Sequence, residues 1–193
     1  MDGSGFKPGK GRKVAFWRAL AEAEGLPPPK TPEQYAGLYI RWSLYGYYSD
    51  LAKQYEKRLL QLGYRLVNRD RHHCICGARI EHGWLLVNHT AKLYAIVGSE
   101  CKEKFFMPRA NSPRVALMQA IWLLSTLANE LRRVGIWAGR IERLLGAAIY
   151  YIEKYTKYRD VYVSKRFADA LEQYTGIKWR WKTWEGGARK GGS

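Results

Sequence analysis

The sequence predicts a mainly helical α+β fold for this chain of 193 residues. Two observations carry the prediction. Long stretches place apolar residues at helical spacing and end at glycine or proline, whereas two short central stretches alternate or run apolar as paired strands do. The apolar fraction of 47% is sufficient for a core. We therefore expect one β-hairpin, flanked by N-terminal helices and by a C-terminal helical hairpin.

The N-terminal part divides into an arm and a helical segment. Residues 1–13 are rich in glycine and basic side chains, which is typical of a flexible basic arm. Residues 14–63 form the helical segment, in which a first helix ends at Gly25. A second helical pattern begins after Thr31, which has capping-box spacing, and extends to Leu62. The weak points of this second pattern are Gly37 and Gly46.

Residues 64–107 are expected to form a hairpin module. Its two main strands are residues 79–87 and 92–97, joined by a turn that begins at Asn88. A shorter strand, residues 64–68, precedes them. Ser99 then caps a short helix that begins at the next residue.

Residues 112–176 are expected to form a helical hairpin followed by a short helix. The first helix begins at Ser112 and breaks at Gly135, and its leucines at spacings of three and four mark a buried stripe. The second helix follows at residues 137–158. Residues 177–193 form a basic, tryptophan-rich tail.

All three cysteines lie at the base of the predicted hairpin, at Cys74, Cys76 and Cys101. Cys74 and Cys76 share one face if their segment is extended, Gly77 permits a bend, and the hairpin returns Cys101 to the same end. Three cysteines cannot all pair, so we expect metal ligation in a reducing, cytoplasmic compartment rather than a disulfide framework. The spacing predicts a structural Zn²⁺ ion that staples the hairpin.

A fourth zinc ligand has to come from a histidine or from an outside group. His72 is favoured because it shares the face of the first two cysteines in an extended segment, and His73 is the second choice. His82 lies partway along the hairpin and His89 lies in its turn, so both are farther from the sulfurs. All four histidines stay open as candidates.

The run Cys74-Ile75-Cys76-Gly77, a turn at Asn88, and Val97-Gly98-Ser99-Glu100-Cys101 with Phe105 after it resemble a treble-clef-like zinc finger. More narrowly, they resemble a C-x-C-G…V-G-S-x-C module of proteins from viruses and mobile elements, over residues 72–106. The first pair is spaced C-x-C rather than C-x-x-C, and the second half offers one cysteine. The resemblance implies a structural zinc site and a nucleic-acid context, and it names no activity.

The formal net charge of +16 predicts a polyanionic partner, DNA or RNA. One group of cations surrounds the cysteines, and Arg65 belongs to the same cluster. Its candidate nucleic-acid-binding residues are Arg69, Arg71, Arg79, Lys92, Lys102 and Lys104. A second candidate group lies in the tail: Lys178, Trp179, Arg180, Trp181 and Lys182. If the tail is extended, its two tryptophans share a stacking face, although they can equally cover the core from an edge strand.

These observations predict a non-catalytic nucleic-acid-binding protein with a structural zinc site. It acts either alone or as a subunit of a nucleoprotein complex such as a CRISPR-type effector, a ribosome or a virus particle. The alternative is a metal-dependent nuclease of HNH-like type, because Asn88 and His89 belong to the hairpin of the predicted zinc module and the site of HNH nucleases is also a ββα-metal hairpin. A catalytic zinc served by Glu81, Glu100 or Glu103 is a further possibility. No apolar stretch reaches the length of a membrane span, so we expect no membrane partner.

Overall fold

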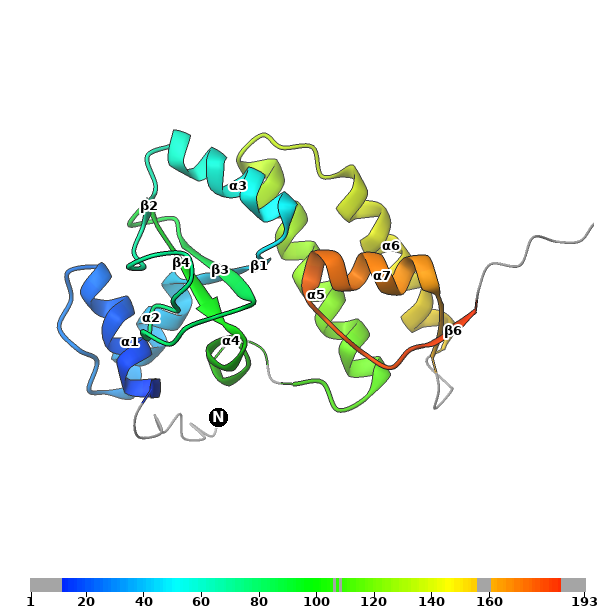
Figure 1. Ribbon diagram of the computed structural model, residues 1–193, viewed down its shortest axis with the longest axis horizontal. Helices are drawn as coiled ribbons and strands as arrows, with labels where there is room; N and C mark the ends of the chain where they lie inside the picture. The colour runs from blue at the N-terminus through cyan, green and yellow to red at the C-terminus, as the bar shows by residue number, and fades with distance from the viewer. Residues whose placement is uncertain (1–11, 106, 108, 156–160, 185–193) are drawn as a thin grey trace, which may run out of the picture. The chain divides into compact units, whose positions relative to one another are not determined.

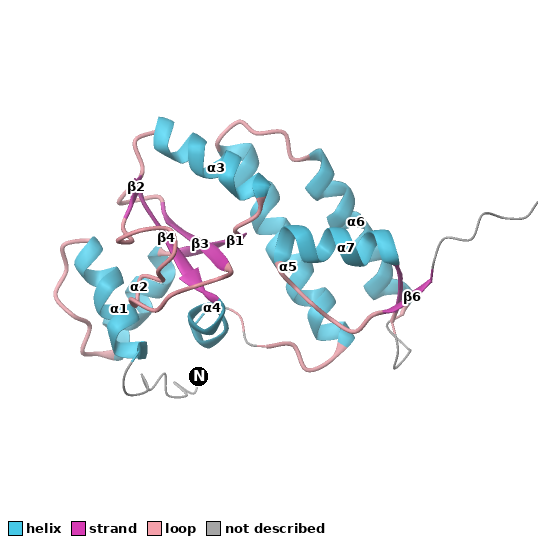
Figure 2. Cartoon of the chain, viewed as in Figure 1, coloured by secondary structure: helices cyan, strands magenta, loops and turns pink. Residues whose placement is uncertain are grey.

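The computed structural model describes residues 12–105, 107, 109–155 and 161–184. Within these residues the chain forms seven helices and two small sheets and is 52% helical (Figures 1 and 2). The predicted α+β class is confirmed. Most of the predicted basic arm and the end of the tail lie outside the described residues.

The chain divides into two compact units. Unit 1 comprises residues 1–48 and 56–108, and unit 2 comprises residues 49–55 and 109–193. None of the described helices combines the length and apolar character needed to cross a bilayer.

Unit 1 is built on a four-stranded mixed sheet. Its strands are β1 (Ser43–Tyr47), β2 (Arg65–Leu66), β3 (Gly83–Asn88) and β4 (Leu93–Gly98). The spatial order is β1-β3-β4-β2, with antiparallel pairing except between β4 and β2. Every residue of β3 and β4 is buried, which explains why these strands read as continuous apolar runs.

Helices complete unit 1. These are α1 (Arg12–Ala23), α2 (Pro32–Arg41), α4 (Ser99–Phe105) and the second half of α3 (Asp50–Gln61). Phe16, Trp17 and Leu20 place the apolar side of α1 in the core, each at most 1% exposed. The capping box predicted at Thr31 is present at the start of α2, where its side chain accepts from the backbone amide of Gln34.

The prediction of one helical pattern from Thr31 to Leu62 is wrong between α2 and α3. The helix ends at Trp42, and the next five residues form β1 against β3. The register shifts between Leu44 and Gly46, where glycine takes a φ of +155° that other residues rarely adopt. The apolar and aromatic side chains here fit both a helical and a strand period, and pairing with β3 decides between them.

Unit 2 is mainly helical. It contains α5 (Pro113–Arg133), α6 (Gly139–Lys154) and α7 (Lys165–Thr175), with β5 (Tyr162–Ser164) parallel to β6 (Lys182–Trp184). Helices α5 and α6 run side by side in opposite directions (Figure 1), as the sequence predicts. Their contact uses the leucine stripe of α5, in which Leu117, Leu124 and Leu131 are fully buried. The three-residue strand β5 is absent from the sequence prediction because it is too short to show a period, whereas β6 lies in the tail segment for which an edge strand is one of the two interpretations.

Candidate metal centre and cationic surfaces

Residues 72–80, which we call the cysteine knuckle, fold as a tight local hairpin. The amide of Cys74 donates to the carbonyl of Ala78 at 2.7 Å, and the amide of Ile80 donates to the carbonyl of His72 at 2.9 Å. The bend lies at Gly77, whose φ of +90° favours glycine and whose amide returns to the Cys74 carbonyl. The knuckle is therefore turned rather than extended around Cys76.

Asn68, Ile80 and a backbone hydrogen bond from the amide of Ile75 to the carbonyl of Ile96 fix the cysteine knuckle on the β3–β4 hairpin. The side chain of Asn68 accepts from the amide of Ile96 at 2.7 Å, and its amino group donates to the carbonyls of His73 and Ile96. Ile80 packs on Gly98 so closely that a Cβ there would lie 2.7 Å from the Ile80 side chain. Glycine at this position thus lets the knuckle sit against the end of β4, where α4 begins.

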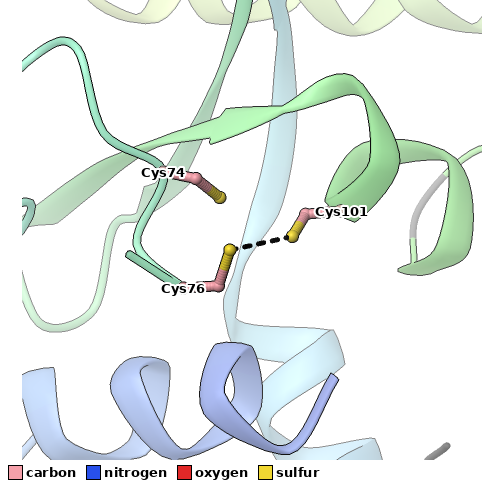
Figure 3. Close-up of side chains that lie close together, drawn as sticks. All are labelled: Cys74, Cys76 and Cys101. Carbon is pink, nitrogen blue, oxygen red and sulfur yellow. Dashed lines mark hydrogen bonds between the residues drawn. The ribbon is translucent and has the colours of Figure 1, made fainter. Parts of the chain in front are cut away.

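This docking brings the three sulfurs together. Cys101 lies in the first turn of α4, and its Sγ is 3.6 Å from Sγ of Cys76. Sγ of Cys74 completes a group in which all three sulfurs lie within 4.8 Å of one another. The three side chains point toward a common centre from two separate segments of the chain (Figure 3).

The spacing of the sulfurs fits a tetrahedral metal ion. Metal–sulfur distances of about 2.3 Å place sulfurs about 3.8 Å apart in a tetrahedron. The Cys76–Cys101 separation of 3.6 Å matches this value, and the limit of 4.8 Å on the other pairs requires only a small closure. The group therefore offers three of the four ligands of a possible metal site.

The three thiols shift one another's pKa values. A hydrogen bond from Cys101, with backbone donors at Cys76 and Gly98, lowers the pKa of Cys74 to about 6 although burial opposes the shift. Burial raises the pKa of Cys76. The hydrogen bond to Cys74 and burial raise the pKa of Cys101. One sulfur in the group thus carries negative charge readily, as a metal-binding thiolate does.

No histidine or carboxylate of the described residues joins the three sulfurs in this group. The favoured fourth ligand, His72, is exposed, and its backbone amide donates to Asp70 at 2.8 Å. The geometric reason for favouring it applies only as far as Cys74, because the segment is paired as a strand at His73 and turns between Cys74 and Gly77. His73 directs Nδ1 to the Asp70 carboxylate at 2.8 Å. The fourth ligand stays a prediction.

The two histidines farther out have tyrosine partners. Nδ1 of His82 lies 3.0 Å from the Tyr47 hydroxyl, and Nδ1 of His89 lies 2.9 Å from the Tyr64 hydroxyl. Asn88 is fully buried, and its side-chain oxygen accepts from the amide of Ala91 to close the β3–β4 turn. These contacts account structurally for the Asn88-His89 pair that motivates the nuclease alternative.

A buried carboxylate, which the sequence analysis misses, anchors the loop before the cysteine knuckle. Glu56 on α3 is 5% exposed and accepts hydrogen bonds from the hydroxyls of Tyr48 and Tyr94 at 2.5 and 2.7 Å. Arg71 adds an ion pair at 2.8 Å. Burial alone would raise the pKa of Glu56, but these hydrogen bonds outweigh it and the pKa is lowered. Arg71 is a candidate nucleic-acid-binding residue. Its half-exposed side chain already forms an ion pair with Glu56 inside unit 1.

The other predicted cations near the cysteines divide into two groups. Arg69, Arg79 and Lys92 are exposed, as is Arg65, and none of these four forms an ion pair with a described acid. Lys102 is a correction: it is 6% exposed, with its ammonium 4.4 Å from the ring centre of Trp84, so it does not belong to the exposed rim. The side chain of Lys104 lies outside the described residues.

A pocket of about 420 Å³ adjoins the cysteine knuckle within unit 1. Arg65 and Arg69 line it together with Asn68, Cys74 and one acid, Glu22. Two exposed arginines and the buried Cys74 therefore line the same pocket.

The tail candidates lie in unit 2 and do not form one extended strip. The amide of Trp181 donates to the carbonyl of Trp179, which makes a tight turn, and the two half-buried rings lie 6.4 Å apart. Lys178 is exposed and pairs with Glu172 at 3.1 Å. Arg180 and Lys182 are exposed, and Lys182 lies in β6 over the ring of Tyr162. The expected alternation of faces fails at the turn.

Comparison of the chain with protein-family models, with curated proteins and with solved structures finds no match.

Proposed function

We propose that the protein binds DNA or RNA without catalysing a reaction, and that a structural zinc ion on Cys74, Cys76 and Cys101 holds the binding face of unit 1 rigid. The observation that carries the proposal is the presence of four exposed cations without described acidic partners, Arg65, Arg69, Arg79 and Lys92, on the unit that holds the three convergent thiols. Arg65 and Arg69 line the pocket that Cys74 also lines, and Arg79 lies in the cysteine knuckle, whereas Lys92 lies at the turn end of the β3–β4 hairpin. Ion pairing within the protein would neutralise such charges, so their exposure favours an external polyanion.

Zinc is the metal that this donor set favours. Three thiolates are soft ligands, and zinc commonly takes four thiolate or imidazole ligands in structural sites. His72 stays our first choice for the fourth position and His73 the second. Metal affinity should fall for the variant of the true ligand, His72→Ala or His73→Ala, and should be unchanged for the other.

Backbone contacts within unit 1 hold these cationic residues in place. The amide of Arg65 donates to the carbonyl of Lys92 at 3.0 Å, which joins β2 to the start of β4. Arg79 is the bridge partner of His73 within the cysteine knuckle. A metal ion that fixes the knuckle would therefore also fix the position of Arg79, whereas Arg65 and Lys92 are positioned by the pairing of β2 with β4.

The test is the salt dependence of binding to labelled DNA and RNA, measured by fluorescence anisotropy on the zinc-loaded protein. Each phosphate contact contributes about 0.9 to the slope of log affinity against log salt concentration, so Arg69→Gln with Arg79→Gln should lower the slope by about 2. Lys30→Gln with Lys57→Gln removes the same charge from exposed positions elsewhere in unit 1 and should change the slope less.

Equal effects of the two double variants would contradict a binding face at the cysteine knuckle. Flat affinity between low and physiological salt would contradict nucleic-acid binding altogether. Metal-dependent cleavage of the same oligonucleotides, abolished by His89→Ala, would replace the proposal with the nuclease alternative.

A further inference from the structure

Two aromatic rings are exposed along one side of α6. Trp137, just before the helix, is 71% exposed, and Tyr150, near its end, is 55% exposed. Large aromatic side chains usually bury most of their surface because water contact is unfavourable. Two such rings beside one helix therefore indicate a surface that contacts something else.

The structure holds Trp137 in place. A Cβ on Gly139 would lie 2.3 Å from Cζ2 of the indole, so the ring lies directly against the glycine backbone. The guanidinium of Arg143, one helical turn farther on, lies 5.6 Å from the ring centre. The indole is thus supported from the helix and exposed toward solvent.

Tyr150 repeats the arrangement at the other end of the helix. The ammonium of Lys154, again one turn on, lies 5.5 Å from its ring centre. Positions 139, 143, 146, 150 and 154 fall on one helical face, because they are spaced by three or four residues. About 16 Å separates Gly139 from Tyr150 along the axis, at 1.5 Å per residue. We call Trp137, Arg143, Tyr150 and Lys154 the α6 track.

The charge beside the α6 track is mainly positive. Arg140, Arg143 and Lys154 form no ion pair with a described acid. Two acids lie on α6 near this face: Glu142 is occupied by an ion pair with Arg132, and Glu153 is exposed at the flank. The middle of the track holds Gly146, beside which a Cβ would meet nothing within 4 Å, so no side chain interrupts the surface there.

We propose that the α6 track binds single-stranded nucleic acid, with bases stacked on Trp137 and Tyr150 and with phosphates near Arg143 and Lys154. This inference rests on the proposed function and adds the strandedness of the ligand and a second site, in unit 2. Unpaired bases present their faces to aromatic rings, whereas the bases of a duplex are already stacked on each other. Stacking tolerates any sequence because every base has such a face.

The experiment compares single-stranded and duplex DNA of about 16 nucleotides, a length that covers a typical single-strand site. Trp137→Ala and Tyr150→Ala should each weaken single-strand binding by about 10-fold, within the range measured for base stacking. Duplex binding should change by less than twofold. Trp122→Ala removes another exposed tryptophan of unit 2, 45% exposed and without a cation over its ring, and should leave both affinities unchanged.

A glycine pair tests the position of the indole without removing it. Gly139→Ala should displace the Trp137 ring, since the new Cβ would overlap it, and should weaken single-strand binding nearly as much as Trp137→Ala. Gly37→Ala adds the same methyl group to a helix of unit 1, away from the α6 track, where the nearest atom is the flexible end of the Arg41 side chain, so single-strand binding should stay within twofold. Circular dichroism on all variants checks that the helices form.

The outcomes separate this inference from the proposed function. Loss of single-strand binding alone supports the α6 track. Equal loss on both ligands overturns the stacking role, because charge alone would act on both. Unchanged single-strand binding in folded Trp137 and Tyr150 variants overturns the inference but leaves salt-dependent binding by unit 1 intact. A wild-type protein that binds neither ligand overturns both proposals.

Discussion

Different interactions stabilise the interior of each of the two units of this protein. Unit 1 has an apolar core, but its irregular loop before β3 is joined to the rest of the unit by polar side chains, those of the buried Glu56 and of Asn68, and three thiols converge beside it. Unit 2 relies on the apolar contact of α5 with α6 along a leucine stripe. The difference teaches that irregular chain needs specific cross-links, because its backbone groups lack the regular partners that a helix provides.

The largest expected effect is the loss of unit 1 on metal removal. A structural zinc site can contribute about 10 kcal/mol or more to folding, so chelation or Cys76→Ser should expose the amides of β3 and β4 to hydrogen exchange. The amides of α5 and α6 should keep their protection, because unit 2 contains no cysteine. Hydrogen-exchange mass spectrometry reads both units in one sample.

Readdition of zinc serves as the control for chelation and should restore protection in the wild type but not in the Cys76→Ser protein. Equal loss of protection in both units, or none in either, would remove the distinction drawn between them.

Much of this contrast is visible in the sequence, and the missing part has physical causes. The cysteines predict their own convergence, because a hairpin must return its ends to one place. The sequence does not predict the partners of Glu56, because they lie 8, 15 and 38 residues away and meet it only in the folded unit. One signal was present: Glu56 lies among Ala52, Tyr55 and Leu59, which form the buried side of α3.

The same reasoning explains the errors among the predicted cations. A prediction from sequence places every lysine in solvent. Lys102 instead lies in the short helix α4, one residue after the buried Cys101, and its ammonium lies over the ring of Trp84. The strip of Trp179 and Trp181 depends on an extended tail, and this condition is not met where the amide of Trp181 donates to the carbonyl of Trp179. The exposure of Trp137 has no local signal, since its support at Gly139 is a backbone contact.

In unit 2 the next largest effect should come from a cavity. Leu124 is fully buried on α5, so Leu124→Ala should lower the free energy of unfolding of this unit by about 2–5 kcal/mol. Metal content should be unchanged, because the cysteines belong to unit 1. Chemical denaturation followed by circular dichroism, with metal analysis of the same samples, gives both quantities.

A fall in metal content in the folded Leu124→Ala protein would contradict independent stabilisation of the two units. Met118→Ala on the same helix is 55% exposed and should cost less than about 0.5 kcal/mol.

Glu56→Gln should destabilise unit 1 by about 2 kcal/mol, since it weakens hydrogen bonds to a charged acceptor. The effect should depend on pH in a defined direction. The pKa of Glu56 is lowered in the folded protein, so its stabilisation is complete above the ordinary carboxyl pKa of about 4.3 and is lost as pH falls toward the folded value. Denaturation at pH 7 and at pH 3 measures the difference.

The difference in free energy of unfolding between wild type and Glu56→Gln should therefore be large at pH 7 and small at pH 3. A gap that widens in acid would show that Glu56 is protonated in the folded state. Asp50→Asn, which removes an exposed ion pair with Lys53, should have little effect at either pH.

The smallest expected effects are a matched pair of helix caps, one in each unit. Thr31 and Ser164 each accept a hydrogen bond from a backbone amide three residues on, so Thr31→Ala and Ser164→Ala should each cost about 1 kcal/mol. Hydrogen exchange should show each loss only in its own unit. An effect of Ser164→Ala on β3 or β4 amides would mean that the units unfold together.

The most direct test of the central claim, that three convergent thiols bind one metal ion, is the metal content of protein purified without added metal. Plasma mass spectrometry should find about one zinc per chain, with a sharp reduction in Cys76→Ser and in Cys101→Ser. Wild-type protein that is free of metal and fully protected in β3 and β4 would contradict the claim.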